Sequence, residues 1–160
     1  MIIADSGPLI ALANLELIEI LHQLFKEILL PQQVYSECTV NMHLPGAMII
    51  QKAVHACVLK LKKISEFHSS FADPYLGDGE RAAMSLALIN NTPVLLDDRR
   101  ARMTAERQHL QVIGTAGILL AAKQKRLIQD IKPFIKKLED FGYYISAELK
   151  ISLLKRANEH

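Results

Sequence analysis

The chain contains no tryptophan, only two cysteines and six histidines among its 160 residues. Cys38 and Cys57 lack both a nearby partner and metal-motif spacing, so both are predicted to be buried residues in a reducing compartment. The histidines form no HxH or HExxH pattern, which argues against a zinc site. The sequence also offers no glycine-rich phosphate loop, no Ser/His/Asp set and no Cys/His pair.

Long hydrophobic runs are missing as well. The longest apolar stretches, such as residues 113–122, fall short of the roughly 20 residues that span a bilayer. The amino terminus enters strand-like sequence that already contains Asp5, which is unlike a signal peptide. With 50% hydrophobic and 22% charged residues, the composition predicts a single globular domain over residues 1–160, cytoplasmic and without a membrane contact.

Charge is distributed unevenly along the chain. Residues 1–98 contain 6 Lys and Arg against 11 Asp and Glu, a balance of −5. Residues 99–160 contain 13 against 6, a balance of +7. An acidic half beside a basic half fits a metal site flanked by a phosphate-binding surface, although basic helices can also be simply solvated faces.

Short apolar segments alternate with helical periodicity over most of the chain. This order predicts the α/β class, with a parallel twisted sheet of four or five strands and helices on both faces. Strands are expected at residues 2–5, 27–30, 94–96 and 111–113, and residues 58–64 fit either an edge strand or a helix tail. Helices are expected at residues 9–25, from Pro31 up to a loop that begins at Asn41, at residues 47–57, 80–90 and 99–109 and, with Thr115 as N-cap, up to about 125. Residues 128–160 are predicted to form a helical carboxyl-terminal extension.

Carboxylates follow several of these apolar segments. Asp5 ends the first strand, Glu80 opens a helix after Gly77-Asp78-Gly79, and Asp97-Asp98 end the most hydrophobic strand. In a parallel sheet such residues gather along the carboxyl edge, where α/β folds bind ligands. Several carboxylates there suggest a cation with oxygen ligands. Each also has a structural explanation, because Asp5 and Asp78 can cap helices and Glu80 can stabilise a helix dipole.

Three arginines, Arg99, Arg100 and Arg102, directly follow Asp98 at a predicted helix start. Positive charge at a helix N-terminus opposes the helix dipole, which favours negative charge there, and the sequence shows no structural gain that would compensate. We expect these arginines to bind phosphate, with pairing to Asp97 and Asp98 as the alternative.

Taken in order, these segments resemble the PIN-domain family and, within it, the toxin-like branch related to VapC. The segments that carry the resemblance are Ile3-Ala4-Asp5-Ser6-Gly7-Pro8-Leu9-Ile10, Leu30-Pro31-Gln32-Gln33-Val34-Tyr35-Ser36-Glu37, Leu76-Gly77-Asp78-Gly79-Glu80-Arg81-Ala82-Ala83, Leu95-Leu96-Asp97-Asp98-Arg99-Arg100-Ala101-Arg102 and Val112-Ile113-Gly114-Thr115-Ala116-Gly117-Ile118-Leu119. The extension from Ile131 to Leu154 is similar to the helical end of one subgroup.

The resemblance implies a three-layer PIN-like fold and a metal-dependent endoribonuclease, the toxin of a type II toxin–antitoxin pair with a cognate antitoxin. It implies catalytic roles for Asp5, Glu37, Glu80 and Asp98. Asp5, Glu80 and Asp98 would hold Mg²⁺ or Mn²⁺, with Asp97 as a substitute ligand.

Two positions depart from the family pattern, which leaves an alternative open. Glu80 stands where many relatives have Asp, and Leu96 stands where a hydroxyl residue is common. The alternative is a PIN-fold interaction module with lost or attenuated nuclease activity. A flavodoxin-like phosphoacceptor domain would share the acidic edge, but no strand-end lysine is evident.

The extension is rich in apolar residues, which can pack on the sheet's flank or extend a homodimer interface. We expect a homodimer, with Lys136, Lys137, Lys155 and Arg156 beside the acidic site in an RNA-binding groove. The apolar residues concerned are Ile131, Phe134, Ile135, Leu138, Phe141, Tyr144, Leu149, Ile151, Leu153 and Leu154.

Overall fold

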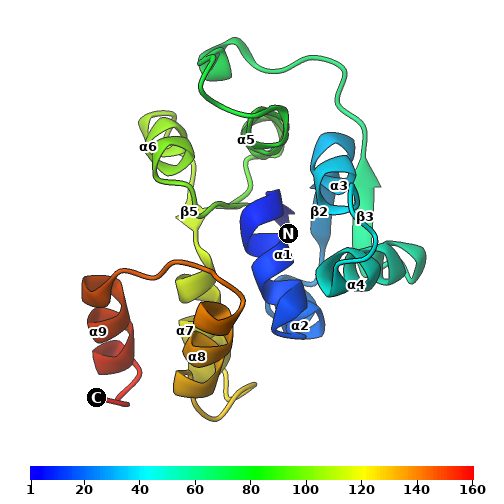
Figure 1. The fold of residues 1–160 in the computed structure, drawn as a ribbon. Coiled ribbons are helices and arrows are strands. Elements are labelled where there is room, and N and C mark those ends of the chain that lie inside the picture. The colour runs from blue at the N-terminus through cyan, green and yellow to red at the C-terminus, as the bar shows by residue number, and fades with distance from the viewer.

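The computed structural model describes all 160 residues, and its centre is a five-stranded, fully parallel sheet (Figure 1). The strand order is β3-β2-β1-β4-β5, which confirms the predicted α/β class. In the centre of the sheet, Ile3 pairs with Leu29 on one side and Val94 on the other. The strands are β1 (Ile2–Ala4), β2 (Ile28–Pro31), β3 (Leu59–Lys62), β4 (Val94–Leu95) and β5 (Val112–Ile113). Residues 58–64 thus contain an edge strand.

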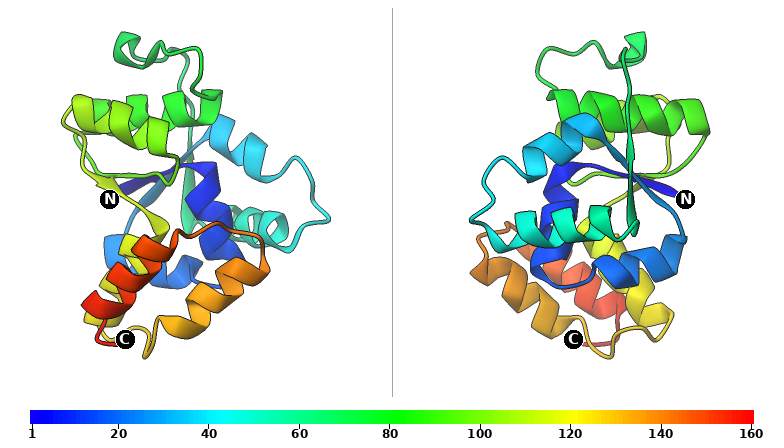
Figure 2. Two further views of the ribbon diagram at one scale, coloured as in Figure 1. Left: turned by 60° about the vertical axis from the view of Figure 1, so that its left-hand side comes forward. Right: turned by 90° about the vertical axis from the view of Figure 1, so that its right-hand side faces the viewer.

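Helices cover both faces of the sheet, in three layers (Figures 1 and 2). Helices α5 and α6 lie on one side, and α1, α2, α4 and α7 lie on the other. Helix α3 packs against α5 beside β2, and α9 packs against α7. The helices are α1 (Ser6–Asn14), α2 (Ile18–Phe25), α3 (Gln32–Cys38), α4 (Pro45–His55), α5 (Asp78–Asn90), α6 (Arg99–Arg107), α7 (Thr115–Gln124), α8 (Lys132–Asp140) and α9 (Ala147–Arg156), with a short 3-10 turn η1 (Ser69–Phe71).

The single helix predicted at residues 9–25 is wrong, because two helices, α1 and α2, meet there at 119°. The chain turns at Glu16, whose φ of 59° is left-handed, and the Leu17 N–H bonds back to the Leu12 carbonyl. Both segments have apolar positions at helical spacing, so periodicity alone could not locate the break. No single helix is long and apolar enough to cross a membrane, and only this bent pair would qualify by length and composition.

One hydrophobic cluster of 39 buried residues fills the space between the layers. Ile2, Ile3 and Ala4 of β1 are fully buried, as expected for the central strand of a parallel sheet. The extension joins this cluster through residues that include Ile131, Ile135, Leu138 and Leu153. Other apolar residues of the extension, including Tyr144 and Ile151, stay exposed. Packing on the flank of the sheet therefore accounts for some apolar residues of the extension, and the others stay exposed and available for a homodimer interface.

The two cysteines differ from each other. Cys38 is buried, as predicted. Cys57 is exposed, so the prediction for it is wrong, because the chain turns at this residue with a φ of 61° after α4 has ended.

Candidate active site

Asp5 is the innermost carboxylate at the carboxyl edge of the sheet. It follows β1 directly, is only 4% exposed, and its backbone N–H donates to the Leu95 carbonyl of β4. Its side chain makes no capping bond to α1, and its Oδ1 is buried without a hydrogen-bond partner. Burial, together with the nearby charges of Glu80, Glu37 and Asp97, raises the pKa of Asp5 to about 7. The Asp5 side chain therefore does not cap α1.

Glu37 links helix α3 to helices α1 and α5 through hydrogen bonds. It lies in the last turn of α3, and its Oε2 accepts a hydrogen bond of 2.8 Å from Ser6 Oγ at the start of α1. Its Oε1 accepts a second bond of 3.0 Å from the Gly79 N–H in the first turn of α5. Ser6 is a partner that the sequence reasoning missed, although it follows Asp5 directly in the first segment.

Glu80 occupies the third position of α5, with Gly77 as the N-cap rather than the predicted Asp78. Its Oε2 accepts a hydrogen bond of 3.0 Å from the Gly77 N–H. Partial burial raises the pKa of Glu80, as do the charges of Asp98 and Glu37, while the bond from Gly77 opposes them. The side chain thus has a capping role, and it also faces other carboxylates.

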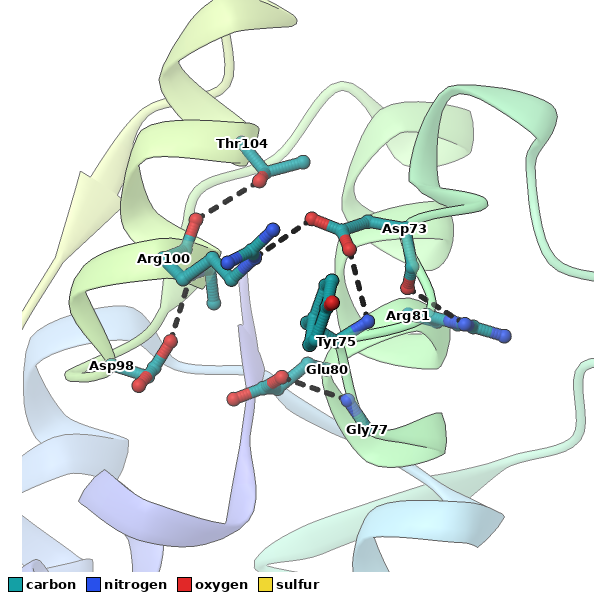
Figure 3. Close-up of polar contacts among 9 residues, drawn as sticks. Asp73, Tyr75, Gly77, Glu80, Arg81, Asp98, Arg100 and Thr104 are labelled. Carbon is teal, nitrogen blue, oxygen red and sulfur yellow. Dashed lines mark hydrogen bonds and ion pairs between the residues drawn. The ribbon is translucent and has the colours of Figure 1, made fainter.

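Asp98 is the N-cap of α6, and its Oδ1 accepts a hydrogen bond of 2.9 Å from the Ala101 N–H. Figure 3 shows the Asp98 and Glu80 side chains approaching each other from α6 and α5. Asp98 also adds to the raised pKa of Glu80, which places the two charges within electrostatic reach. The capping role leaves Asp98 exposed to solvent at the mouth of the site.

The structure therefore brings together all four predicted catalytic carboxylates, from the end of β1, from α3 and α5, and from the N-cap of α6. They lie where the strand order reverses between β1 and β4, the usual ligand position of an open α/β sheet. As they stand, no group of three or more His, Cys, Asp or Glu side chains is arranged to hold a metal ion. Glu37 and Glu80 instead accept hydrogen bonds from backbone N–H groups, which offset part of their mutual repulsion. The unpartnered Oδ1 of Asp5 among these charges is what a divalent cation would satisfy.

Asp97 has a different environment from Asp98. Its Oδ1 accepts a bond of 2.8 Å from the Thr115 N–H, and its Oδ2 accepts one of 2.6 Å from Thr115 Oγ1. Tyr143 from the extension lies near Asp97, and burial first, with the Asp97 charge second, raises the pKa of Tyr143. Thr115 is the first residue of α7 and Gly114 is the N-cap, so the predicted cap is off by one. No local signal identified Tyr143, because it reaches Asp97 from a distant segment.

The three arginines separate in space. The Nη1 of Arg102 donates to the Leu96 carbonyl at 2.8 Å. The Nε of Arg100 donates to Asp73 Oδ2 at 2.9 Å, and its guanidinium lies over the Tyr75 ring (Figure 3). Arg99 is exposed and has no bonded partner in the protein. Pairing with Asp97 or Asp98, the alternative considered from sequence, is not observed.

A parallel α/β sheet with clustered carboxylates at its switch point defines a class of acidic α/β domains suited to divalent cations. Over residues 1–159 the chain matches a family model described as DUF3368, PIN domain. The chain therefore belongs to the PIN-domain family, whose members are typically nucleases and generally use divalent metals.

Among solved structures, the chain is similar to "a domain of a functionally unknown protein" from Methanocaldococcus jannaschii DSM 2661. The two are 20% identical, the match covers 71% of this chain and 89% of the other, and the TM-score is 0.49. No curated protein matches the chain.

Proposed function

We propose that this protein is a Mg²⁺- or Mn²⁺-dependent endoribonuclease whose active site consists of Asp5, Glu37, Glu80 and Asp98. The observation that carries the proposal is Asp5. A carboxylate that is 4% exposed, with an unpartnered Oδ1 and three other carboxylates nearby, is costly to bury in its ionised form unless it meets a cation. A fold alone would not require such an arrangement.

Each residue has a role that follows from its position. Asp5, Glu80 and Asp98 would hold the cation through oxygen atoms, the ligand type that Mg²⁺ and Mn²⁺ prefer. Such a cation would supply Lewis-acid polarisation of a phosphoryl oxygen and a more acidic bound water. Glu37, oriented by Ser6 and Gly79, would position or deprotonate the attacking water. Arg99, which is exposed beside Asp98, would contact the substrate phosphate.

The test is cleavage of end-labelled structured and unstructured RNAs by the purified protein with Mn²⁺, with Mg²⁺ and with EDTA. We expect internal cleavage that needs the metal, and its loss by about a hundredfold or more in Asp5→Asn and Glu37→Gln. Asp140→Asn is the matched control, because Asp140 is exposed on α8 and pairs only with Lys136. Cleavage that survives Asp5→Asn would refute the assignment.

A second candidate function is a PIN-fold interaction module without efficient cleavage. Two observations favour it, namely the absence of a ready three-carboxylate metal group and the buried Leu96 where a hydroxyl residue is common. It predicts no RNA cleavage, no growth arrest on expression, and no heat of Mn²⁺ binding by calorimetry.

We further propose that the nuclease is the toxin of a type II pair and works as a homodimer. A short open reading frame next to the gene, encoding a small DNA-binding or helical protein that abolishes growth arrest when co-expressed, would support the pair. Ile151 on α9, which is 67% exposed, provides an apolar contact for a second copy. Light scattering at micromolar concentration should give a dimer, and Ile151→Glu should give a monomer.

A further inference from the structure

Tyr75 is a large aromatic residue whose side chain is almost entirely in solvent. It is 77% exposed in the loop before α5, and the Arg100 guanidinium lies 4.5 Å from its ring centroid. Figure 3 shows this arrangement beside Glu80, with Arg100 reaching the ring from α6. A tyrosine that served only to fasten the loop would bury its ring, and this one does not.

The position of the ring is nevertheless fixed. Asp73 accepts two hydrogen bonds through its carboxylate, one of 2.9 Å from Arg100 Nε and one of 2.9 Å from the Tyr75 backbone N–H. The Asp73 carbonyl accepts a third bond, of 2.7 Å, from Arg81 Nη2 on α5. Arg100, Asp73 and Tyr75 thus form an ordered unit, which we name the Tyr75 clasp. It holds one face of the ring against a cation and leaves much of the ring exposed.

The Tyr75 clasp lies beside the carboxylates of the candidate active site. Tyr75 precedes Glu80 by five residues, and Arg100 follows Asp98 by two, so the clasp joins the two segments that carry these carboxylates. The Nε of Arg100 is paired with Asp73, and this pairing holds the guanidinium over the Tyr75 ring. An aromatic face backed by a guanidinium is a surface on which an unpaired nucleobase stacks.

We propose that the Tyr75 clasp is a stacking platform for one unpaired nucleobase of the RNA, next to the phosphate held at the acidic site. The proposal rests on the proposed ribonuclease function and narrows its substrate to RNA that is single-stranded at this position. A base within a duplex has both faces covered by its neighbours and cannot reach the ring. The platform selects for an unpaired base and tolerates different bases, since every base has a π face.

The absence of tryptophan allows a direct test of stacking. Tyr75→Trp gives a protein with a single indole, and the variant is combined with Asp5→Asn in EDTA so that no RNA is cleaved. Titration with a short single-stranded oligouridylate should quench the indole fluorescence of this variant saturably. A blunt duplex of the same length and an abasic single strand should quench it several-fold less. Ile89→Trp, at a position that is 67% exposed near the far end of α5, is the control and should not respond.

A second measurement gives the contribution to affinity. Tyr75→Leu should weaken binding of the labelled single strand about tenfold in fluorescence anisotropy, whereas Tyr75→Phe should bind like the wild type. Fluorescence of the Tyr75→Trp variant that stays unquenched while the oligouridylate is bound overturns the platform. If the wild type also cleaves RNA, the proposed function survives that result. Failure of both binding and metal-dependent cleavage overturns both proposals.

Discussion

The backbone N–H of Gly79 donates a hydrogen bond of 3.0 Å to Oε1 of Glu37, joining the first turn of α5 to the last turn of α3. A side chain at this position would force the Glu37 carboxylate to move. A Cβ atom on Gly79 would lie 2.5 Å from Oε1 and 2.6 Å from Oε2 of Glu37. Gly79 is therefore the residue that allows α5 to receive the Glu37 carboxylate.

Gly79→Ala should displace Glu37 and lower RNA cleavage by at least about tenfold. Urea denaturation should show a loss of about 1–3 kcal/mol, because the added methyl overpacks the contact. Asp140→Asn is the control, because Asp140 is exposed on α8 and pairs only with Lys136. It should change the stability by no more than about 0.5 kcal/mol.

A double-mutant cycle tests the cause of this loss. Glu37→Asp shortens the carboxylate by one methylene and relieves the contact with the new methyl group. In the Gly79→Ala background it should restore part of the stability, so the two changes should not add. Strictly additive losses would show that Gly79→Ala acts by some other route.

Much of the fold follows from local sequence patterns. The apolar segments around Ile3, Leu29 and Val94 became the three central strands because a strand buried on both faces needs a continuous apolar run. The break between α1 and α2 could not be predicted, since it depends on a left-handed residue, Glu16, with no glycine to mark it. Local propensity does not predict an uncommon backbone conformation that tertiary packing supports.

In the candidate site too, some residues could be predicted from the local sequence, whereas contacts between distant segments could not. Asp5, Glu80 and Asp98 could be proposed because each directly follows an apolar strand or opens a helix, so the topology brings them together. The two bonds from Thr115 to Asp97, and the position of Tyr143 close to Asp97, bring together segments that only folding makes neighbours. The Tyr75 clasp was missed for the same reason, because Tyr75 lies in a loop without periodicity.

The first pH prediction concerns Asp5. Its pKa of about 7 in the folded protein lies above its ordinary value of 3.8, so folding favours the protonated form. The metal-free protein should therefore lose stability as the pH rises from about 4 to about 7, by an amount on the order of 4 kcal/mol. Asp5→Asn removes the charge, so in EDTA its melting temperature should exceed the wild type's at pH 8 and match it near pH 4. A wild-type melting curve that does not change over this range would contradict the prediction.

Mn²⁺ should restore the stability that the metal-free protein loses as the pH rises. At pH 8, saturating Mn²⁺ should raise the melting temperature of the wild type, because a ligand that binds only the folded state stabilises it. The increase should be much smaller in Asp5→Asn, and Asp140→Asn should respond like the wild type. An equal increase in all three proteins would mean that the cation binds elsewhere.

Asp97 and Asp98 are neighbours whose substitution should have opposite consequences. Asp97→Asn cannot accept both bonds from Thr115, so it should cost about 1–3 kcal/mol in urea denaturation and leave Mn²⁺ affinity within about twofold. Asp98→Asn should cost little stability, because Asn is also a good N-cap, but it should weaken Mn²⁺ binding at least about tenfold in calorimetry. A larger loss of Mn²⁺ affinity in Asp97→Asn would instead make Asp97 the ligand.

The last prediction concerns Glu159, which fastens the end of the chain to the rest of the domain. Its Oε1 accepts bonds from Lys123 Nζ at 2.6 Å and from the Ile131 N–H at 2.7 Å, and its Oε2 accepts one of 3.0 Å from the Lys132 N–H. Burial alone would raise the pKa of Glu159, but the bond from Lys123 and the two backbone donors lower it below the ordinary value. The stabilisation is therefore present above about pH 4.5 and is lost as the pH falls further.

Glu159→Ala should cost about 2–3 kcal/mol at pH 7, because it leaves three donors without their acceptor. The cost should shrink as the pH falls below about 4.5 and through the lowered pKa of Glu159, because the wild-type carboxylate then becomes protonated as well. Limited proteolysis should then cut first between α7 and α8, since Ile131 and Lys132 lose the bonds that hold the start of α8. Glu106→Ala, an exposed position on α6, should change neither the stability nor the cleavage pattern. Equal protease resistance of the Glu159→Ala variant and the wild type would show that apolar contacts of α8 and α9 alone hold the extension in place.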